Sequence, residues 1–299
     1  MVDLSKLTTE SRNPATMDLD HMTPLELATV MNREDENVVA GVRKVLPEIA
    51  QAITWCTESL KKGGRIIYIG AGTSGRLGLL DAVECPPTFG VPPEKVIGLL
   101  AGGEKAFIKA VEGAEDSRTL GVEDLKAIGL CADDTVIGLA ASGRTPYVIY
   151  ALRYAKETGC HTIAVACNHG SKIGQEAELA IEPVCGPEVL TGSTRLKSGT
   201  AQKMVLNMIS TGSMVGIGKA YKNLMVDVMQ TNEKLVTRAE NIVMTATECS
   251  REEAAEALKK THGSAKTAIV MLLLDCDETQ AAERLKKADG HIRGTLNNR

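Results

Sequence analysis

Five short apolar runs alternate with amphipathic stretches over the first two thirds of the sequence. Runs of this length without polar alternation are typical of strands that are buried on both faces. Because helical patterns separate them, we expect one parallel sheet with helices on both faces, a three-layer α/β fold of the flavodoxin-like kind. The predicted strands are Arg65–Ile69, Val96–Leu100, Thr135–Ala140, His161–Ala166 and Leu179–Pro183.

The residues before the first strand predict helices. Thr23, Pro24 and Glu26 form the pattern of a helix start, with Thr23 as the N-cap and Glu26 closing a capping box. Apolar residues then recur at helical spacing over Val38–Leu60, and we expect Pro47 to kink this longer helix. The polar residues before Thr23 have the composition of a loose arm, although the stretch TTESRN could fold over a neighbouring subunit.

Helices are also predicted between and after the strands. Pro86 and Pro87 are expected to stop the helix that follows the first strand. Past Asn232 the one candidate strand is Ala268–Leu274, which itself lies in a helical context. Further helices are predicted at about Glu104–Glu112, Asp116–Ile128 and Tyr147–Thr158, from the hydroxyl-rich segment 191–203 to about Lys219, and with starts at Ser250, Ser264 and Asp277.

These elements divide the sequence into three expected parts. Residues 1–64 form an N-terminal arm and helices, residues 65–232 form the sheet domain, and residues 233–299 form a small helical domain. Hydrophobic residues make up 43% of the chain but aromatic residues only 3%, so the core must be built from Val, Ile, Leu, Ala and Met. Such a core suits a parallel sheet between helices.

Composition excludes several classes of partner. The formal net charge of −4 and the absence of a dense Lys/Arg run argue against nucleic acid or an anionic membrane surface. No apolar stretch is long enough to span a membrane. The eight cysteines include no C-x-x-C pair, which favours a reducing cytoplasm. The five histidines show no ligand-like spacing, so we expect no metal site and no cofactor.

A glycine-rich loop follows the first predicted strand. Gly70, Gly72 and Gly75 let the backbone turn sharply, and Thr73 and Ser74 stand where the loop becomes a helix. The first turn of a helix offers unpaired N–H groups and a partial positive charge, so this loop is a candidate phosphate site. A dinucleotide site is an alternative, but the acidic residue that would hold the ribose is missing after the next strand. A tight turn without a ligand also remains open.

A second loop repeats this pattern after the third predicted strand. Ser142, Gly143, Arg144 and Thr145 lie between that strand and a helix, as the first Ser-Gly-Arg string does. Loops at the carboxyl ends of parallel strands lie at one edge of the sheet, where open α/β folds bind ligands. A third hydroxyl-rich segment, TGSTRLKSGTAQK, contains Ser193 and Thr194 and is either a ligand site or a capped helix start.

The two Ser-Gly-Arg loops resemble those of the sugar isomerase (SIS) family, whose members hold the phosphate of a phosphosugar with hydroxyls and backbone amides. Nearly the whole chain is similar to one family with this domain, the N-acetylmuramic acid 6-phosphate etherases. The strings that carry the resemblance are GAGTSGRLG, DAVECPPTFG, VEGAEDS, ASGRTPYV, TGSTRLKSGTAQK and NLMVDV, in that order.

The resemblance implies cleavage of a lactyl ether on a phosphosugar during recycling of cell-wall sugars. It also implies that Glu84 of ECPPT and Glu115 of EGAEDS are the two active-site acids. Together with the many apolar positions in the early helices, it predicts a homodimer whose sites are completed by the other subunit. The predicted phosphate contacts are Ser74, Ser142 and Thr145, with Thr73, Ser193 and Thr194 as secondary candidates, and Gly72, Gly143 and Arg144 are further predicted substrate contacts.

The chemistry of such an ether favours elimination over direct displacement, because an alkoxide is a poor leaving group. Removal of the acidic hydrogen on carbon 2 of the open-chain sugar lets the oxygen on carbon 3 depart, and water then adds. This route needs a base and an acid, and we assign Glu115 as the base and Glu84 as the acid. Two alternatives use the same loops: a non-catalytic phosphosugar sensor that regulates a partner, and an aldose–ketose isomerase.

Overall fold

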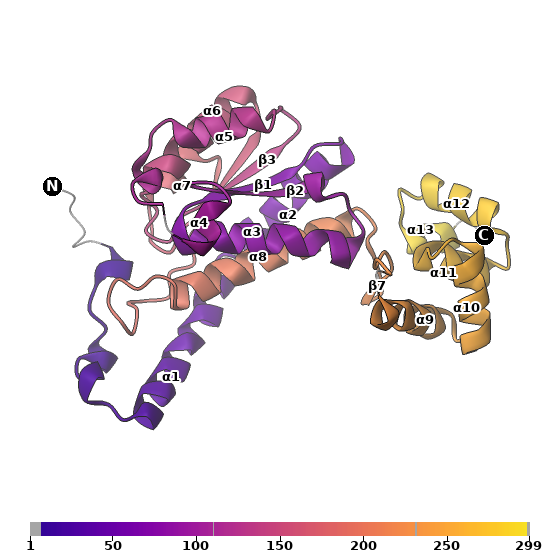
Figure 1. The fold of residues 1–299 in the computed structure, drawn as a ribbon, viewed down its shortest axis with the longest axis horizontal. Helices are drawn as coiled ribbons and strands as arrows, with labels where there is room; N and C mark the ends of the chain where they lie inside the picture. Colours follow the sequence, from indigo (N-terminus) through magenta and orange to yellow (C-terminus); the bar gives the residue numbers. More distant parts are fainter. Residues whose placement is uncertain (1–6, 110, 231, 298–299) are drawn as a thin grey trace. The chain divides into compact units, whose positions relative to one another are not determined.

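The computed structural model describes residues 7–109, 111–230 and 232–297. Its main sheet has five strands in the order β2-β1-β3-β4-β5, and every neighbouring pair is parallel (Figure 1). The predicted α/β fold is therefore confirmed. The strands are β1 (Ile66–Gly70), β2 (Val96–Leu100), β3 (Thr135–Leu139), β4 (His161–Val165) and β5 (Leu179–Ile181), each within a residue or two of its predicted bounds.

Helices cover both faces of this sheet, as Figure 1 shows. On one face α5 (Leu120–Ala127) and α6 (Pro146–Thr158) lie over the sheet, and Ile67 and Ile69 of β1 share an apolar core with Leu152. On the other face lie α2 (Leu46–Lys61), α3 (Gly72–Phe89) and α8 (Lys197–Gly216). Every residue of β1 and β3 is buried, which is the physical reason for their unbroken apolar sequences.

The N-terminal region differs from its prediction in two respects. The residues before Thr23 are not a loose arm, because Thr9, Asn13 and Thr16 are buried and bonded to the same chain. The capping box of Thr23 and Glu26 is present and opens α1 (Pro24–Arg43). The predicted kink at Pro47 is instead a complete break, because α1 ends at Arg43 and α2 begins at Leu46. Proline has no N–H to continue a helix but fits its first turn, where no donor is required, and Pro47 stands in the first turn of α2.

The prediction that Pro86 and Pro87 stop the helix was wrong. Helix α3 runs through both prolines and ends at Phe89. The hydrogen bonds that the two prolines cannot donate would lie only near the end of the helix. The amide of Gly90 still donates to the carbonyl of Pro86 at 2.9 Å. Gly90, at φ +60°, is the residue at which the backbone leaves the helix.

The segment between β2 and β3 is less helical than its sequence predicts. The predicted helix over Glu104–Glu112 shrinks to the single turn α4 (Lys105–Ile108), and the helix over Asp116–Ile128 is α5 alone. Gly103 and Gly113 flank α4 in left-handed conformations, at φ +72° and +78°. These glycines turn the chain away from helical geometry on both sides. The 3₁₀ turn η5 (Ala114–Asp116) lies in this segment, and another, η4 (Pro93–Lys95), comes directly before β2.

The chain divides into two compact units. The sheet unit comprises the residues up to Val83 together with Glu94–Ser210, and the helical unit comprises Glu84–Pro93 together with the residues from Thr211 on. The remaining short helices of the sheet unit are η1 (Thr8–Glu10), η2 (Pro14–Thr16), η3 (Leu19–His21) and α7 (Lys172–Glu176). No helix in the described residues is long and apolar enough to cross a membrane.

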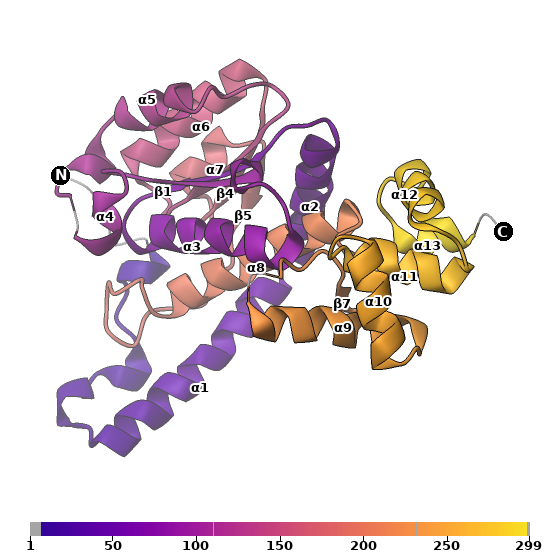
Figure 2. The same ribbon diagram turned by 45° about the vertical axis from the view of Figure 1, so that its right-hand side comes forward.

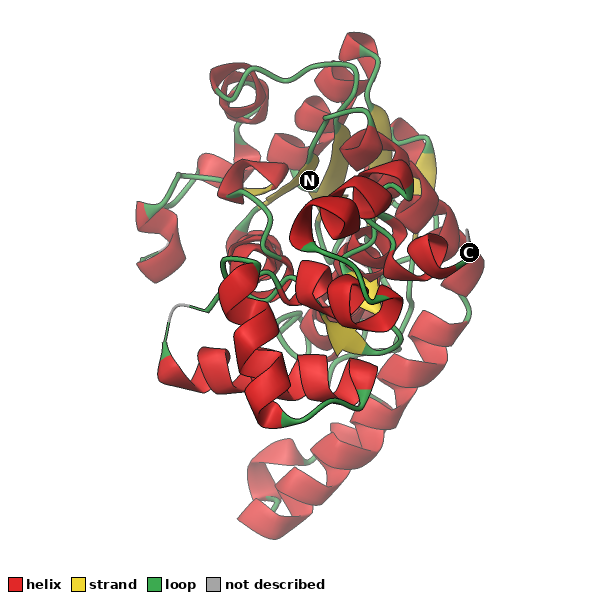
Figure 3. Ribbon diagram, turned by 90° about the vertical axis from the view of Figure 1, so that its right-hand side faces the viewer, coloured by secondary structure: helices red, strands yellow, loops and turns green. Residues whose placement is uncertain are grey.

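The helical unit has its own apolar core. The predicted helix starts at Ser250, Ser264 and Asp277 are confirmed, since each side chain accepts a hydrogen bond from a first-turn amide. The candidate strand Ala268–Leu274 was wrong, because those residues belong to a helix. The elements of the helical unit are β6 (Ala220–Tyr221), β7 (Leu224–Met225), α9 (Glu233–Thr247), α10 (Arg251–Lys260), α11 (Ala265–Leu274), α12 (Glu278–Lys287) and α13 (Ile292–Leu296). Figure 3 colours the helices red and shows that they make up most of the regular structure.

Replacing Gly98 with Ala should destabilise the sheet unit by about 1 to 3 kcal/mol. A Cβ on Gly98 of β2 would lie 2.5 Å from Cα of Leu79, so α3 would have to move away from the sheet. Urea unfolding followed by the fluorescence of Trp55, the one tryptophan, measures this effect. The control is Gly199→Ala in α8, where the nearest heavy atom is 3.5 Å away. Equal stability of the two variants would contradict the prediction.

Candidate functional site

The first glycine-rich loop joins β1 to α3 through a very short connection. Strand β1 ends at Gly70 and α3 begins at Gly72, whose φ is +54°. A Cβ on Gly75 would lie 2.5 Å from the carbonyl oxygen of Gly70. Only glycine allows this approach, which brings the first turn of α3 directly onto the end of the strand. The unpaired amides of that turn therefore lie at the carboxyl edge of the sheet.

The second loop joins β3 to α6. The amide of Gly143 donates to the carbonyl of Ala140 at 2.9 Å, and a Cβ on Gly143 would lie 2.3 Å from Cβ of Ser171. Thr145 is the N-cap of α6, but its hydroxyl makes no capping hydrogen bond. Pro146 has no N–H and the amide of Val148 donates to the carbonyl of Thr145 at 3.1 Å, so the amide of Tyr147 is the first-turn donor that remains for an anion.

The sheet order places these two loops side by side. Strand β1 pairs directly with β3, and Gly70 lies opposite Leu139 at their carboxyl ends. From there α3 leaves toward one face and α6 toward the other (Figure 1). This is the switch point of an open α/β sheet, where the diverging connections leave room for a ligand. The predicted neighbourhood of the two Ser-Gly-Arg loops is therefore present.

The third predicted segment reaches the same region through α8. Figures 1 and 2 both show α8 alongside α3. A Cβ on Gly199 would lie 3.7 Å from Cγ2 of Thr73 and 3.5 Å from the carbonyl oxygen of Thr194. The fully buried carboxylate of Glu188 accepts hydrogen bonds from the amides of Lys197 and Ser198, at 3.0 and 2.9 Å. The N-terminus of α8 is therefore already neutralised by the protein.

The hydroxyl groups of the three segments differ in their hydrogen bonding. Ser74 is buried, and its hydroxyl donates to Oε1 of Gln202 at 2.8 Å. Within the described residues, the other candidate hydroxyls have no hydrogen-bond partner and their residues are only partly buried. They belong to Thr73, Ser142, Thr145, Ser193 and Thr194. These groups remain available to a ligand, whereas Ser74 would have to give up its bond to Gln202.

A small cavity of about 110 Å³ lies beside the first loop, and Glu115 lines it together with Gly72 and Arg76. Glu115 is exposed and belongs to η5, the 3₁₀ turn that begins directly after the left-handed Gly113. The guanidinium of Arg76 donates to the carbonyls of Ala106 and Phe107, at 2.6 and 2.8 Å. Arg76 thereby fastens the segment around α4, which leads to Glu115, onto α3.

Glu84 does not lie near the first loop of its own chain. It is exposed and belongs to α3, which begins at Gly72. Because an α-helix rises about 1.5 Å per residue, Glu84 lies about 18 Å along the helix from Gly72. Glu115 thus lines a cavity beside the first loop, whereas Glu84 stands several turns further along α3.

Three residues that organise the site were not predicted. Gln202 binds Ser74, Asn168 donates to the carbonyls of Ala141 and Ser142 at 3.2 and 3.4 Å, and Arg76 holds the Glu115 segment. Asn168 follows the end of β4, so its place after a predicted strand was an available signal. Gln202 stands within the hydroxyl-rich string that the sequence already singled out.

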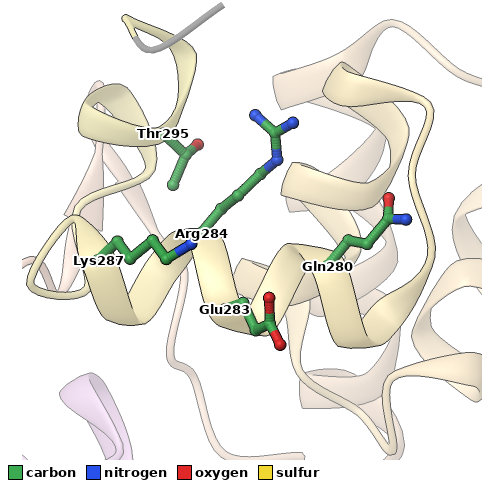
Figure 4. Close-up of a pocket in the computed structure, with 5 residues that line it drawn as sticks. All are labelled: Gln280, Glu283, Arg284, Lys287 and Thr295. Atoms are coloured by element: carbon green, nitrogen blue, oxygen red, sulfur yellow. The ribbon is translucent and has the colours of Figure 1, made fainter.

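A second cavity, of about 440 Å³, lies in the helical unit and holds none of the predicted residues. Figure 4 shows its lining, with Gln280, Glu283, Arg284 and Lys287 on α12 and Thr295 on α13. Among the described residues, no group of three or more His, Cys, Asp or Glu side chains is arranged to hold a metal ion. The candidate site is therefore the edge of the sheet around the two Ser-Gly-Arg loops.

Comparisons with known proteins identify the class of this fold. Residues 129–211 match the SIS domain, and residues 48–156 match the glucokinase regulatory protein N-terminal SIS domain. A phosphoheptose isomerase from Neisseria gonorrhoeae is similar in structure, with a TM-score of 0.50 and 19% identity, over 63% of this chain and 97% of that one. The sheet unit is thus built on a SIS fold.

Curated relatives identify the family. An N-acetylmuramic acid 6-phosphate etherase from Enterobacter sp. (strain 638) is 59% identical over 99% of this chain and 100% of its own length. Another from Yersinia pestis (strain Pestoides F) is 62% identical over 90% of this chain and 91% of its own length. The chain belongs to the N-acetylmuramic acid 6-phosphate etherase family.

Replacing Ser142 with Ala, or Thr145 with Val, should weaken binding of a 6-phosphorylated amino sugar about tenfold to more than a hundredfold. Each change removes one hydrogen bond to a charged phosphate, worth about 1.5 to 3 kcal/mol. Calorimetric titration measures the loss. Thr54→Val on the exposed surface of α2 is the control, because its hydroxyl only bonds the helix backbone. Unchanged affinity in the Ser142 and Thr145 variants would remove these residues from the site.

Proposed function

We propose that the chain cleaves the D-lactyl ether of N-acetylmuramic acid 6-phosphate, giving N-acetylglucosamine 6-phosphate and D-lactate in the recycling of cell-wall amino sugars. Membership of the etherase family supports this activity directly. The observation in the structure that best supports it is the pairing of β1 with β3. That pairing sets two hydroxyl-bearing loops side by side, with Glu115 lining a cavity next to the first.

The phosphate binds between the first turns of α3 and α6. Amides at both helix N-termini and the hydroxyls of Ser142 and Thr145 supply donors, and the partial positive charges of the two helices favour a dianion. Ser74 joins these donors when its hydroxyl turns from Gln202 toward the phosphate. Gly72, Thr73, Gly143 and Arg144 line the same two loops, while Ser193 and Thr194 contact the sugar from the side of α8.

The reaction is an elimination followed by addition of water. A base removes the proton from carbon 2 of the open-chain sugar. The electron pair left on carbon 2 forms a double bond to carbon 3 as the bond from carbon 3 to the lactyl oxygen breaks, and an acid protonates that oxygen so that lactate leaves. Water adds its oxygen to carbon 3 and a proton returns to carbon 2. Only proton transfers are required, and carboxylic side chains can make them.

Glu115 is the base in this scheme and Glu84 is the acid. The position of Glu115 supports this role, because Glu115 lines the cavity next to the first loop. Only a few bonds separate the phosphorylated carbon 6 from carbons 2 and 3, so the base must lie close to the phosphate. Glu84 lies about 18 Å along α3 from Gly72 and is too far for a substrate held by its own loop.

This separation supports a homodimer in which Glu84 serves the site of the partner subunit. A twofold dimer uses the same surface of both subunits, so Glu84 of each chain would complete the other chain's site. Such an arrangement lets one long helix contribute its start to one site and its far end to the next. All eight cysteines lie in the described part of the chain and none forms a disulfide there, which supports a reducing cytoplasm as the compartment of the reaction.

Replacing Glu84 or Glu115 with Gln should lower turnover about a hundredfold to ten-thousandfold while phosphosugar binding persists. Gln keeps the shape of the side chain but cannot transfer the proton. Release of lactate from N-acetylmuramic acid 6-phosphate measures turnover, and titration measures binding. In heavy-oxygen water the wild-type product should carry the label on carbon 3 of the sugar. In deuterated water it should carry deuterium on carbon 2.

The same assay separates the alternatives. Label in lactate would exclude the elimination, and near-normal turnover in both Gln variants would exclude the residue assignment. A sensor would bind the substrate without releasing lactate, and an isomerase would convert an aldose phosphate into a ketose phosphate. The two variants should also differ: the Glu84→Gln enzyme retains exchange of the carbon 2 hydrogen with solvent, and the Glu115→Gln enzyme does not.

Mixing the two inactive variants should restore activity to about a quarter of the wild-type value, if each site combines Glu115 of one subunit with Glu84 of the other. After subunit exchange about half of the dimers are mixed, and one of the two sites in a mixed dimer has both glutamates. Lactate release after mixing measures the recovery. One variant is isotope-labelled so that mass reveals subunit exchange, and no recovery despite exchange would place both glutamates in the same subunit.

A further inference from the structure

The N-terminal arm is fixed to the second phosphate loop by buried polar groups. Thr9 is only 1% exposed, and its amide donates to Oδ1 of Asn168 at 3.3 Å. Nδ2 of Asn168 donates in turn to the hydroxyl of Thr9 at 3.1 Å and to the carbonyls of Ala141 and Ser142. A single buried amide thus joins the arm to the loop that carries Ser142.

Two more buried side chains fix the arm to the segment before α8. Nδ2 of Asn13 donates to Glu34 at 2.7 Å and to the carbonyl of Pro187 at 3.1 Å, and the hydroxyl of Thr16 donates to the carbonyl of Val189 at 2.9 Å. Asn13 and Thr16 are 5% and 8% exposed. Buried polar side chains are costly unless they are bonded, so these contacts define one position for the arm. The arm is therefore a wall of the site.

Glu10 is the acidic residue that this wall presents to the third hydroxyl-rich segment. A Cβ on Gly192 would lie 3.4 Å from Oε2 of Glu10, so the carboxylate lies next to the turn that carries Ser193 and Thr194. Within the described part of the chain, the Glu10 carboxylate has no hydrogen-bond or ion-pair partner. Its neighbour Thr9, by contrast, is fully bonded.

The electrostatics of this corner exclude phosphate. Glu188 already occupies the amides at the start of α8, and Glu10 adds a second negative charge on the same side. A phosphate here would face like charges, whereas the starts of α3 and α6 attract it. An ionised carboxylate only accepts hydrogen bonds, so it requires a ligand with O–H or N–H donors. A sugar carries such donors on its hydroxyl and acetamido groups.

We propose that Glu10 is a substrate-binding residue whose carboxylate accepts a hydrogen bond from a hydroxyl or amide group of the phosphosugar. The proposal rests on the proposed function, because it takes the phosphate to lie between the Ser74 and Ser142 loops. Glu10 then distinguishes a sugar phosphate from phosphate alone. The residues Thr9, Asn13 and Thr16 have a positioning role, since they hold the arm that carries Glu10.

The test compares two probes that differ only in the sugar. N-acetylglucosamine 6-phosphate presents phosphate and donors, and inorganic phosphate presents the anion alone. The variant Glu10→Ala should weaken binding of the sugar phosphate at least about tenfold and leave binding of inorganic phosphate unchanged. The affinity of Glu10→Gln, which keeps a neutral acceptor, should fall between that of Glu10→Ala and that of the wild type. Asp18→Ala is the control, because this exposed arm carboxylate caps no helix.

In the lactate assay Glu10→Ala should raise KM with little change in kcat, because the hydrogen bond exists in both the bound substrate and the transition state. Equal loss of both probes would show that Glu10 only supports the loops and would overturn the proposal. Unchanged binding of both probes would overturn it as well. The binding comparison needs no ether cleavage, so a wild-type chain that binds the sugar phosphate but releases no lactate would refute the proposed reaction alone.

Discussion

The direct pairing of β1 with β3 is the constraint on which the site depends. It requires the chain to leave one strand toward one face of the sheet and its neighbour toward the other, with β2 displaced to the edge. Both departures use glycines that approach other backbone atoms or a side chain closely, Gly75 against Gly70 and Gly143 against Ser171. The starts of α3 and α6 consequently lie at adjacent strand ends. Two positive helix termini in one place are the physical basis of the proposed phosphate site, which needs no lysine.

The N-terminus of α8, by contrast, is occupied by a carboxylate of the protein itself. Glu188 is completely buried, yet two amides of α8 bond its carboxylate and make its burial tolerable. Lys197, in the same turn, reaches Glu34 of α1 with 2.6 Å between Nζ and Oε2. Burial favours the neutral form of Glu34, but the hydrogen bonds from Lys197 and Asn13 outweigh it and lower its pKa. This network joins α1 and the arm to α8, and it leaves the starts of α3 and α6 as the proposed place for the phosphate.

The sequence was sufficient for the sheet, because strands buried on both faces leave an unbroken apolar signal, and β1 to β5 all fall where that signal lies. It was also sufficient for the two hydroxyl loops, because their glycine and serine residues directly follow predicted strands in the sequence. It was insufficient where the outcome depends on distant partners. Nothing local to Thr9 or Asn13 reveals that Asn168 and Pro187 will bury them. Likewise, the tolerance of Pro86 and Pro87 depends on Gly90 ending the helix just beyond them.

The length of α3 has consequences that its sequence alone did not suggest. The sequence predicted that Pro86 and Pro87 stop the helix after the first strand, and it left the position of Glu84 relative to the first loop undefined. A continuous helix from Gly72 to Phe89 fixes that position, because such a rod cannot bring its two ends to one small ligand. Asp81, one turn before Glu84, is buried and accepts hydrogen bonds from Tyr68 of β1 and Asn207 of α8, at 2.8 and 2.7 Å. These bonds hold the part of α3 before Glu84 along the sheet. The length of the helix supports the proposed homodimer, in which Glu84 of one chain and Glu115 of another act on the same substrate.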